Sequence, residues 1–199
     1  MSGRHIWLAV LLAGCAAGPG YIIKDFTPPR ALAVLPFTNE TNDIEAPGWV
    51  RKALIEVLPR HGYAPLDSSL VDEVLKERFG ITDGGQLGSA TPQNLGKALA
   101  ADGLLYGNVL SFQDLPLGFY RKKTVKINLK ILDSKTGELL WEAEKGWTTP
   151  EVNLNADEAR KAAVRQVADR QKRRLDGTFL KEEAVLALEM ALKSLPSVK

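Results

Sequence analysis

The sequence predicts an α/β domain whose single mixed sheet is packed by helices, with further helices at the carboxy-terminal end. A near-continuous apolar run at residues 30–37, bounded by prolines, indicates a buried central strand. Helical and short extended segments alternate after it. Three extended segments then follow one another between residues 103 and 147, and the last two form an antiparallel hairpin. This hairpin argues against a purely parallel sheet.

The first 14 residues indicate an export signal. Arg4 and the amino terminus supply a positive start, residues 6–12 are apolar, and Ala13 and Gly14 are the small residues that a signal peptidase requires. The apolar run would span only about 10 Å as a helix, against a hydrocarbon core of about 30 Å, so it is too short to cross a membrane. We therefore expect residues 1–14 to be a signal peptide.

Cys15, the single cysteine of the chain, follows this signal directly. Leu12 to Cys15 resembles the lipobox of bacterial lipoproteins, whose cysteine is acylated and becomes the new amino terminus. The resemblance implies that Cys15 is a lipid anchor, because two or three acyl chains hold a protein firmly at a bilayer. Ala16 after the cysteine, rather than aspartate, resembles outer-membrane sorting in a Gram-negative cell. Residues 15–29, rich in glycine and proline, are expected to form a flexible tether.

Two amphipathic helices follow the first strand. Segments 46–62 and 67–80 each place apolar residues on one face, and residues 63–66 between them are a short strand candidate. A polar, glycine-rich loop at residues 81–90 leads to a third helix at 91–101. The residues expected to start or end these helices are Pro59, Gly62, Asp67 or Ser68, Gly80, Thr91 and Pro92.

The hairpin completes the α/β domain, which we expect at residues 30–150. Residues 120–132 alternate between apolar and polar side chains, residues 138–147 do the same, and a turn at 133–138 joins them. Any register that keeps the apolar sides together leaves one packed face and one wet, charge-paired face. The apolar side carries Val125, Ile127, Leu129, Ile131, Leu139, Trp141 and Ala143, and the charged side pairs Lys126 and Lys130 with Glu142 and Glu144.

Residues 151–199 are expected to be helices packed on the same domain. Asn155 with Glu158 forms a pattern like a capping box, and a last amphipathic helix at 181–195 ends before Pro196. The basic cluster from Arg165 to Leu175 has two interpretations. It could contact anionic lipid or peptidoglycan, or it could complement the dipole of a helix with an acidic start, which is the interpretation we favour.

Three segments resemble landmarks of a largely uncharacterised family of bacterial outer-membrane lipoproteins, namely residues 31–41, 101–109 and 129–141. The meningococcal lipoprotein antigen studied as a vaccine candidate is a member. The family is similar to the curli-secretion-channel lipoprotein, to the lipoprotein activators of penicillin-binding proteins, and to the amino-terminal domain of TolB. The resemblance implies a TolB-like fold and an accessory role in envelope secretion, assembly or cell-wall synthesis.

Candidate chemistry is sparse. His61, at a helix end, is more simply a cation near a helix C-terminus than a ligand or base, and Glu142 and Glu144 are more simply ion-pair partners than an acid/base dyad. The loop at 81–90 lacks the lysine and the glycine spacing of a phosphate cradle. We therefore predict no catalytic residue, no metal site and no cofactor, and Cys15 is the only site residue.

The predicted function is that of a non-catalytic, lipid-anchored protein on the periplasmic face of the outer membrane. Its partners would be the membrane, through Cys15, and another envelope protein, with a homo-oligomer as a further possibility. An envelope hydrolase or a small-ligand-binding lipoprotein is the alternative. A nucleic-acid partner is excluded, because 26 basic and 24 acidic residues leave a formal charge of only +2 and no concentrated basic face.

Overall fold

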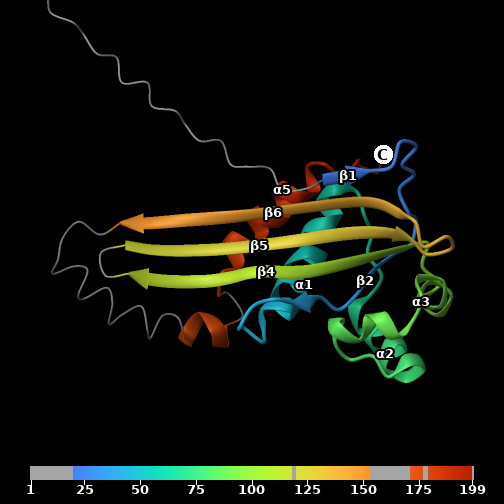
Figure 1. The fold of residues 1–199 in the computed structure, drawn as a ribbon, viewed down its shortest axis with the longest axis horizontal. Helices are drawn as coiled ribbons and strands as arrows, with labels where there is room; N and C mark the ends of the chain where they lie inside the picture. Colours follow the sequence, from blue (N-terminus) through green and yellow to red (C-terminus); the bar gives the residue numbers. More distant parts are fainter. Residues whose placement is uncertain (1–19, 118–119, 153–170, 177–178, 199) are drawn as a thin grey trace, which may run out of the picture.

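The computed structural model describes residues 20–117, 120–152, 171–176 and 179–198 of the 199-residue chain. Within them, a six-stranded sheet is packed by helices (Figure 1). The strands are β1 (Gly20–Ile22), β2 (Leu32–Val34), β3 (Thr38–Asn39), β4 (Gly103–Leu117), β5 (Tyr120–Asp133) and β6 (Leu139–Val152). The helices are α1 (Ala46–Val57), α2 (Ser68–Phe79), α3 (Pro92–Leu99) and α5 (Lys181–Leu192), with 3-10 helices η1 (Leu58–His61) and η2 (Gly84–Ser89).

The sheet is mixed, as the sequence predicts. Its strand order is β1-β6-β5-β4-β2, and β3 pairs with β4 beyond the end of β2. β2 and β3 run parallel to β4, whereas the neighbours β4 and β5, β5 and β6, and β6 and β1 are antiparallel. The predicted hairpin is confirmed, with Lys130 opposite Glu142. The predicted α/β class with a single mixed sheet is therefore confirmed.

Strand β2 corrects one expectation for residues 30–37. The prediction of a central strand is wrong, because β2 ends the strand order and forms its ladder only with β4. The prediction of burial is confirmed, since its three residues are each at most 1% exposed. Its side chains enter apolar clusters on both faces, which explains why an edge strand is as apolar as a central one. The strand candidate at 63–66 reduces to a single bridge between Pro65 and Leu32.

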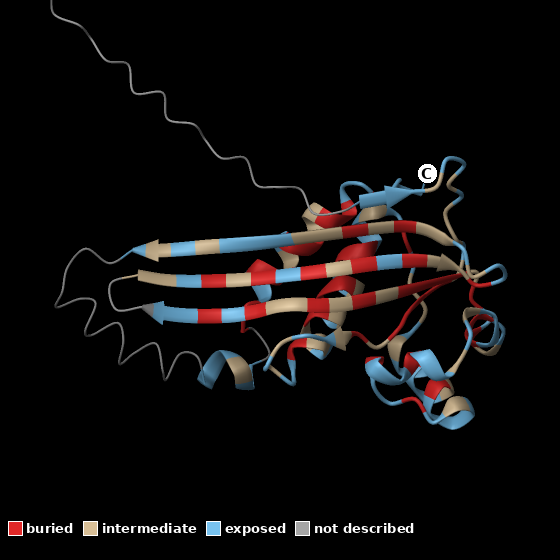
Figure 2. Cartoon of the chain, viewed as in Figure 1, coloured by how far each residue is buried: buried red, intermediate tan, exposed pale blue. Residues whose placement is uncertain are grey.

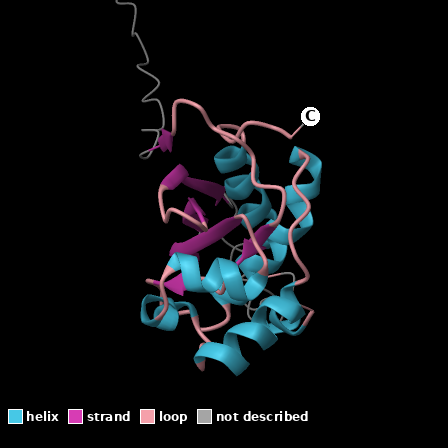
Figure 3. Ribbon diagram, turned by 90° about the vertical axis from the view of Figure 1, so that its right-hand side faces the viewer, coloured by secondary structure: helices cyan, strands magenta, loops and turns pink. Residues whose placement is uncertain are grey.

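Two apolar clusters hold the helices against the sheet. The larger lies between the sheet and helices α1 and α5, and it contains the predicted packed face of the hairpin, including Val125, Ile127 and Trp141. The smaller lies under α2, η2 and α3. In end view the helices gather beside and below the strands (Figure 3), and exposed residues concentrate at the ends of β4 and β6 that reach beyond the helices (Figure 2).

The helix boundaries follow the predicted caps. Asp67 accepts a hydrogen bond from the Leu70 N–H at 3.0 Å, and Thr91 accepts one from the Asn94 N–H at 3.3 Å. Gly80 ends α2 with φ of 68°, in the left-handed region that favours glycine. Local sequence therefore sets where these helices start and stop.

The glycine-rich segment at 81–90 differs from the predicted loop, because it contains the 3-10 helix η2. Asp83 caps η2 by accepting the Gly85 N–H at 2.7 Å, and Gln86 closes the reciprocal bond by accepting the Asp83 N–H at 3.1 Å. Gly84 packs directly on the backbone of Phe37. The glycine at this position is therefore explained by close packing between η2 and the chain after β2.

The variant Gly84→Ala is expected to lose about 1–3 kcal/mol of unfolding free energy, in the range of overpacked sites. A Cβ at this position would lie 2.3 Å from the carbonyl carbon and oxygen of Phe37, so backbone must move. Gly88→Ala in the same 3-10 helix is the matched control, because its Cβ would meet nothing within 4 Å. Urea unfolding of both variants tests this, and equal losses would contradict the packing explanation.

Part of the predicted tether at residues 15–29 belongs to the sheet. Gly20–Ile22 forms β1, antiparallel to β6, and the Ile23 N–H donates to the Leu140 carbonyl at 3.0 Å. Phe26 packs against the larger apolar cluster. Residues 1–19, including Cys15, lie outside the described residues, as do Asn155 and Glu158.

Candidate interaction site

A groove of about 750 Å³ runs beside the outer edge of β4. This edge is paired with β2 and β3 as far as Val109, whose carbonyl accepts the Glu40 N–H at 2.9 Å. From Leu110 to Pro116, no strand in the described part of the chain pairs with it. The groove is lined by Glu40, Thr41, Asn42, Asp43, Ile44, Glu45, Leu110, Phe112, Gln113, Asp114, Leu115, Pro116 and Arg174.

The register shows which backbone groups of β4 face this groove. The pairing with β5 shifts between Val109 and Ser111, so a bulge separates the paired and the open part of the edge. Beyond the bulge, alternation of the antiparallel ladder turns the backbone groups of Phe112, Asp114 and Pro116 outward. Proline has no N–H, so the open edge offers donors at Phe112 and Asp114 and ends at Pro116.

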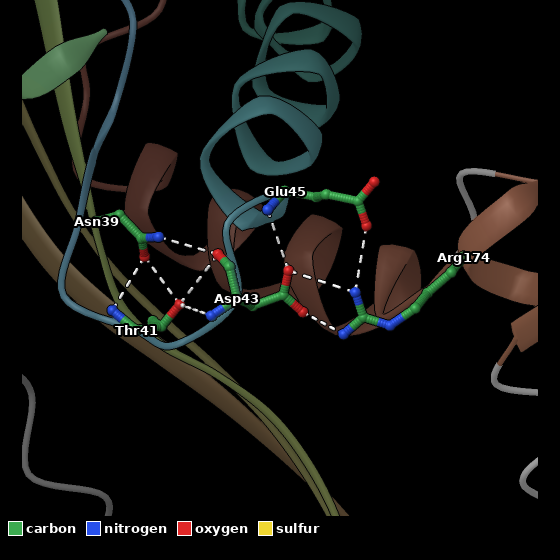
Figure 4. A network of polar contacts seen from close by, with 5 residues as sticks. All are labelled: Asn39, Thr41, Asp43, Glu45 and Arg174. Carbon is green, nitrogen blue, oxygen red and sulfur yellow. Dashed lines mark hydrogen bonds and ion pairs between the residues drawn. The ribbon is translucent and has the colours of Figure 1, made fainter.

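The opposite wall of the groove is a rigid turn between β3 and α1 (Figure 4). Asn39 accepts from the Thr41 N–H at 3.0 Å and donates through Nδ2 to the Asp43 carbonyl at 2.9 Å. Asp43 Oδ1 accepts from the Glu45 N–H at 3.2 Å. Arg174 donates to the Asp43 carboxylate through Nη2 and to Glu45 Oε2 through Nη1 at 3.2 Å. The turn thus fixes two carboxylates around one guanidinium.

Aromatic rings complete the surroundings of that guanidinium. Trp49, Phe112 and Phe179 lie 5.7–5.9 Å apart, centroid to centroid, with tilted or edge-on planes. The Arg174 guanidinium carbon lies 4.5 Å from the Phe179 ring centroid and 5.5 Å from that of Trp49. We call Asp43, Glu45, Trp49 and Phe179 the guanidinium site.

A second ionic cluster lies under the same end of the sheet. Asp114 is 6% exposed and accepts two hydrogen bonds from Arg121, at 2.5 and 2.6 Å. Lys123 lies 2.5 Å from Glu151 and 3.9 Å from the buried carboxylate of Glu183, at the start of α5. The hydrogen bonds to Asp114 raise the pKa of the Arg121 guanidinium, which stays charged. Each of the three carboxylates in this cluster therefore has a cation within 4 Å.

The wet face of the hairpin is charge-paired, as predicted. Lys126 Nζ lies 2.5 Å from Glu144 Oε1, and Lys130 Nζ lies 3.5 Å from Glu142 Oε1. Both lysines and both glutamates point away from the helices. Each glutamate therefore has a lysine beside it. This supports a role for Glu142 and Glu144 as ion-pair partners rather than as an acid/base dyad.

His61 lies at the end of η1, where the sequence places it, but its partner is a side chain of α5. His61 Nε2 is 2.9 Å from Glu189 Oε2, and Arg60 Nη1 is 2.9 Å from Glu189 Oε1. Burial raises the pKa of the Glu189 carboxyl, but the hydrogen bonds and charges of His61 and Arg60 outweigh it, so the net pKa is below its usual 4.5. The cluster therefore joins η1 to α5.

Because the folded pKa of Glu189 is lowered, its charge stabilises the fold above pH 4.5, and this contribution is lost as pH falls through the folded pKa. The variant Glu189→Gln is expected to be less stable than wild type at pH 7, and the difference should shrink at pH 3. Urea unfolding at both pH values measures this. Glu138→Gln, a carboxylate in the exposed turn, is the control, and an equal pH response of the two variants would contradict the assignment.

The structure describes only part of the predicted basic cluster. The basic cluster from Arg165 to Leu175 lies outside the described residues up to position 170, and residues 171–175 are helical. Arg174 of this cluster binds Asp43 and Glu45, which neither interpretation of the cluster anticipated. The described residues contain no group of three His, Cys, Asp or Glu placed to hold a metal ion. No helix among them has the length and apolar character needed to cross a bilayer.

Residues 23–175 match the family of GNA1162-like lipoproteins. The chain belongs to this family. A curated member of similar sequence is the lipoprotein NMB1124/NMB1162 of Neisseria meningitidis serogroup B, 25% identical over 113 residues, or 57% of this chain and 52% of the relative. The chain thus matches about half the length of that relative. Membership of the GNA1162-like family confirms the resemblance to bacterial lipoproteins.

Solved structures support the fold of this GNA1162-like chain. The crystal structure of lipoprotein GNA1162 from Neisseria meningitidis has a TM-score of 0.56 at 23% identity, over 71% of this chain and 99% of that one. The PelC dodecamer from Paraburkholderia phytofirmans has a TM-score of 0.55 at 12% identity, over 91% and 97%. At these identities the likeness concerns the fold, and it extends over nearly the whole of each of the two solved proteins.

Proposed function

We propose that this GNA1162-like lipoprotein is a non-catalytic envelope protein that acts by binding other proteins along the open edge of β4. The observation that carries the proposal is the groove itself. It combines an unpaired strand edge, apolar side chains of Ile44, Phe112 and Leu115, and a fixed ionic wall. Exposed strand edges bind extended segments of other chains, with main-chain hydrogen bonds supplying affinity.

The charged groups support binding rather than catalysis. Buried Asp114 is held by Arg121, Glu151 by Lys123, and the glutamates of the wet face by lysines. Catalytic acids and bases are instead expected in a cleft with a strongly perturbed pKa. No observation on the described residues favours the hydrolase or small-ligand alternative.

We further propose that Cys15 carries the lipid anchor and that the domain lies at the periplasmic face of the outer membrane. The family is one of lipoproteins, and Cys15 follows a short apolar run, as a lipidated cysteine does. Tyr21 in β1 pairs with Glu142 in β6, so the chain enters the domain at the edge of the sheet opposite the groove. An anchor on that side leaves the groove free for a partner.

Self-association is part of the proposal. PelC, which shares this fold over 91% of the present chain, forms a dodecamer. A second copy is therefore one class of partner for the groove, beside another envelope protein.

In-cell photo-crosslinking tests the proposed function. A photoreactive residue replaces Leu115, which is 44% exposed in the groove, or Leu70, which is 53% exposed on α2 and serves as the matched control. We expect a discrete protein adduct at position 115, identified by mass spectrometry, and none at position 70. No adduct at position 115, or the same adducts at both positions, would contradict the proposal.

A further inference from the structure

We infer that the guanidinium site is a binding site for an arginine of a partner strand, and that Arg174 occupies it in the free protein. The inference rests on the proposed docking along β4 and names the chemistry of the partner: an extended segment that carries an arginine. When this segment lies in the groove, its arginine replaces Arg174.

The site selects a guanidinium over other cations. Asp43 and Glu45 both accept hydrogen bonds from one planar group, and the rings of Trp49 and Phe179 lie 5.5 and 4.5 Å from its carbon. Arginine matches this arrangement because its donors form a fixed fork and its plane stacks on aromatic faces. A lysine ammonium is a compact, strongly hydrated point charge that satisfies fewer of these contacts.

The acidic side of the guanidinium site is preformed, whereas the arginine that fills it can be exchanged. The Asp43 side chain is 8% exposed and is held by the turn from Asn39 to Glu45. Arg174 is 27% exposed and Glu45 is 59% exposed, so water reaches their contact. This exposed pair contributes only about 0–1 kcal/mol, and an incoming arginine can reproduce the Arg174 contact with buried Asp43, so it can compete with Arg174.

Charge and position link this site to the strand edge. The lining of the groove holds four acidic side chains and one basic side chain, and of these four acids the nearby Arg121 pairs only with Asp114. The remaining excess of negative charge favours a basic occupant. Phe112 belongs both to the aromatic triad and to the open edge, so a segment bonded to its backbone passes beside the guanidinium site.

A peptide titration tests the inference on the full-length chain. The probe is a short capped peptide of alternating threonine and valine with a central arginine, and matched peptides carry lysine or glutamate at the centre. Binding is measured by calorimetry, and the amide signals of Phe112 and Asp114 are followed by NMR. We expect the Arg174→Ala variant to bind the arginine peptide about tenfold more tightly than wild type, since its site is vacated.

The lysine peptide is expected to bind more weakly than the arginine peptide and the glutamate peptide not at all, while adding Asp43→Asn should abolish the arginine preference. If Arg174→Ala fails to fold, Arg174→Gln, which keeps a side chain of similar reach, takes its place. Equal affinity for wild type and variant, or equal affinity for arginine and lysine peptides, would overturn the inference. Self-association of the variant with no peptide binding would also overturn it, because the groove would then take a second copy through other contacts.

The docking role of β4 and the arginine site can be rejected independently of each other. Peptide binding without an adduct at Leu115 in cells would reject the docking role and keep the arginine site. An adduct at Leu115 without arginine-selective binding would keep the docking role and reject the arginine site.

Discussion

The variant Cys15→Ala is expected to leave the membrane fraction completely while its folded domain keeps the unfolding midpoint of wild type. The anchor is lost because alanine has no sulfur to acylate, and each methylene of a missing acyl chain contributes about 0.8 kcal/mol of membrane binding. The fold is expected to be retained because Cys15 precedes the described residues, and the buried core among these begins only at Leu32. Anchor and fold are therefore separable.

Fractionation of cells, mass spectrometry of the mature amino terminus, and thermal unfolding of the purified protein measure the three parts of this result. Ala17→Ser, which keeps the cysteine and a small neighbour, is the matched control and should remain acylated and membrane-bound. A Cys15→Ala protein that still fractionates with the outer membrane would overturn the anchor assignment. A lowered midpoint would show that the anchor also stabilises the domain.

The helices and the hairpin could be predicted from the sequence because their signals are local. Asp67, Thr91 and Gly80 act within five residues of themselves, and the apolar side chains of β5 repeat every second residue. Such patterns do not depend on what the rest of the chain does. The segment at 81–90 shows the limit, because a reciprocal cap between Asp83 and Gln86 made a 3-10 helix out of residues that look like a loop.

Strand order could not be predicted, because it depends on pairing between distant segments. Leu32 pairs with Gly103, and an apolar sequence is the same whether a strand is central or lies at an edge covered by helices. The guanidinium site was missed for the same reason. Arg174 and Asp43 are 131 positions apart, and each alone looks like an ordinary surface charge. The polar turn from Asn39 to Asp43 was a usable signal for a fixed carboxylate, but not for its partner.

The groove itself arises from where strands stop. β3 has two residues and leaves β4 at Val109, whereas β4 continues to Leu117, so eight residues of β4 extend past their last neighbour on that side within the described part of the chain. The sequence predicts an extended segment for β4, but it predicts neither the two-residue strand β3 nor the point at which β3 leaves β4. The buried ion pair of Asp114 with Arg121 lies within this overhang.

The variant Arg121→Met is expected to lose about 3–5 kcal/mol of unfolding free energy, because removal of one member of a buried pair leaves an uncompensated charge. The Asp114 side chain is 4% exposed and would lose both of its hydrogen bonds from the guanidinium. Lys126→Met in the same strand is the control. Its pair with Glu144 is exposed, so its expected cost is at most about 1 kcal/mol.

Urea unfolding measures the loss of unfolding free energy in both variants. Because both introduce methionine, the difference between them reports the loss of the buried charge pair. The double variant Asp114→Leu with Arg121→Met removes both charges, and its stability should return to within about 1 kcal/mol of wild type, since a buried pair replaced by apolar residues is often neutral. Equal losses for Arg121→Met and Lys126→Met would show that the end of the sheet is not ordered by this pair. Recovery in the double variant would show that the cost of Arg121→Met comes from the unpaired Asp114 carboxylate and not from a large net stabilisation by the pair.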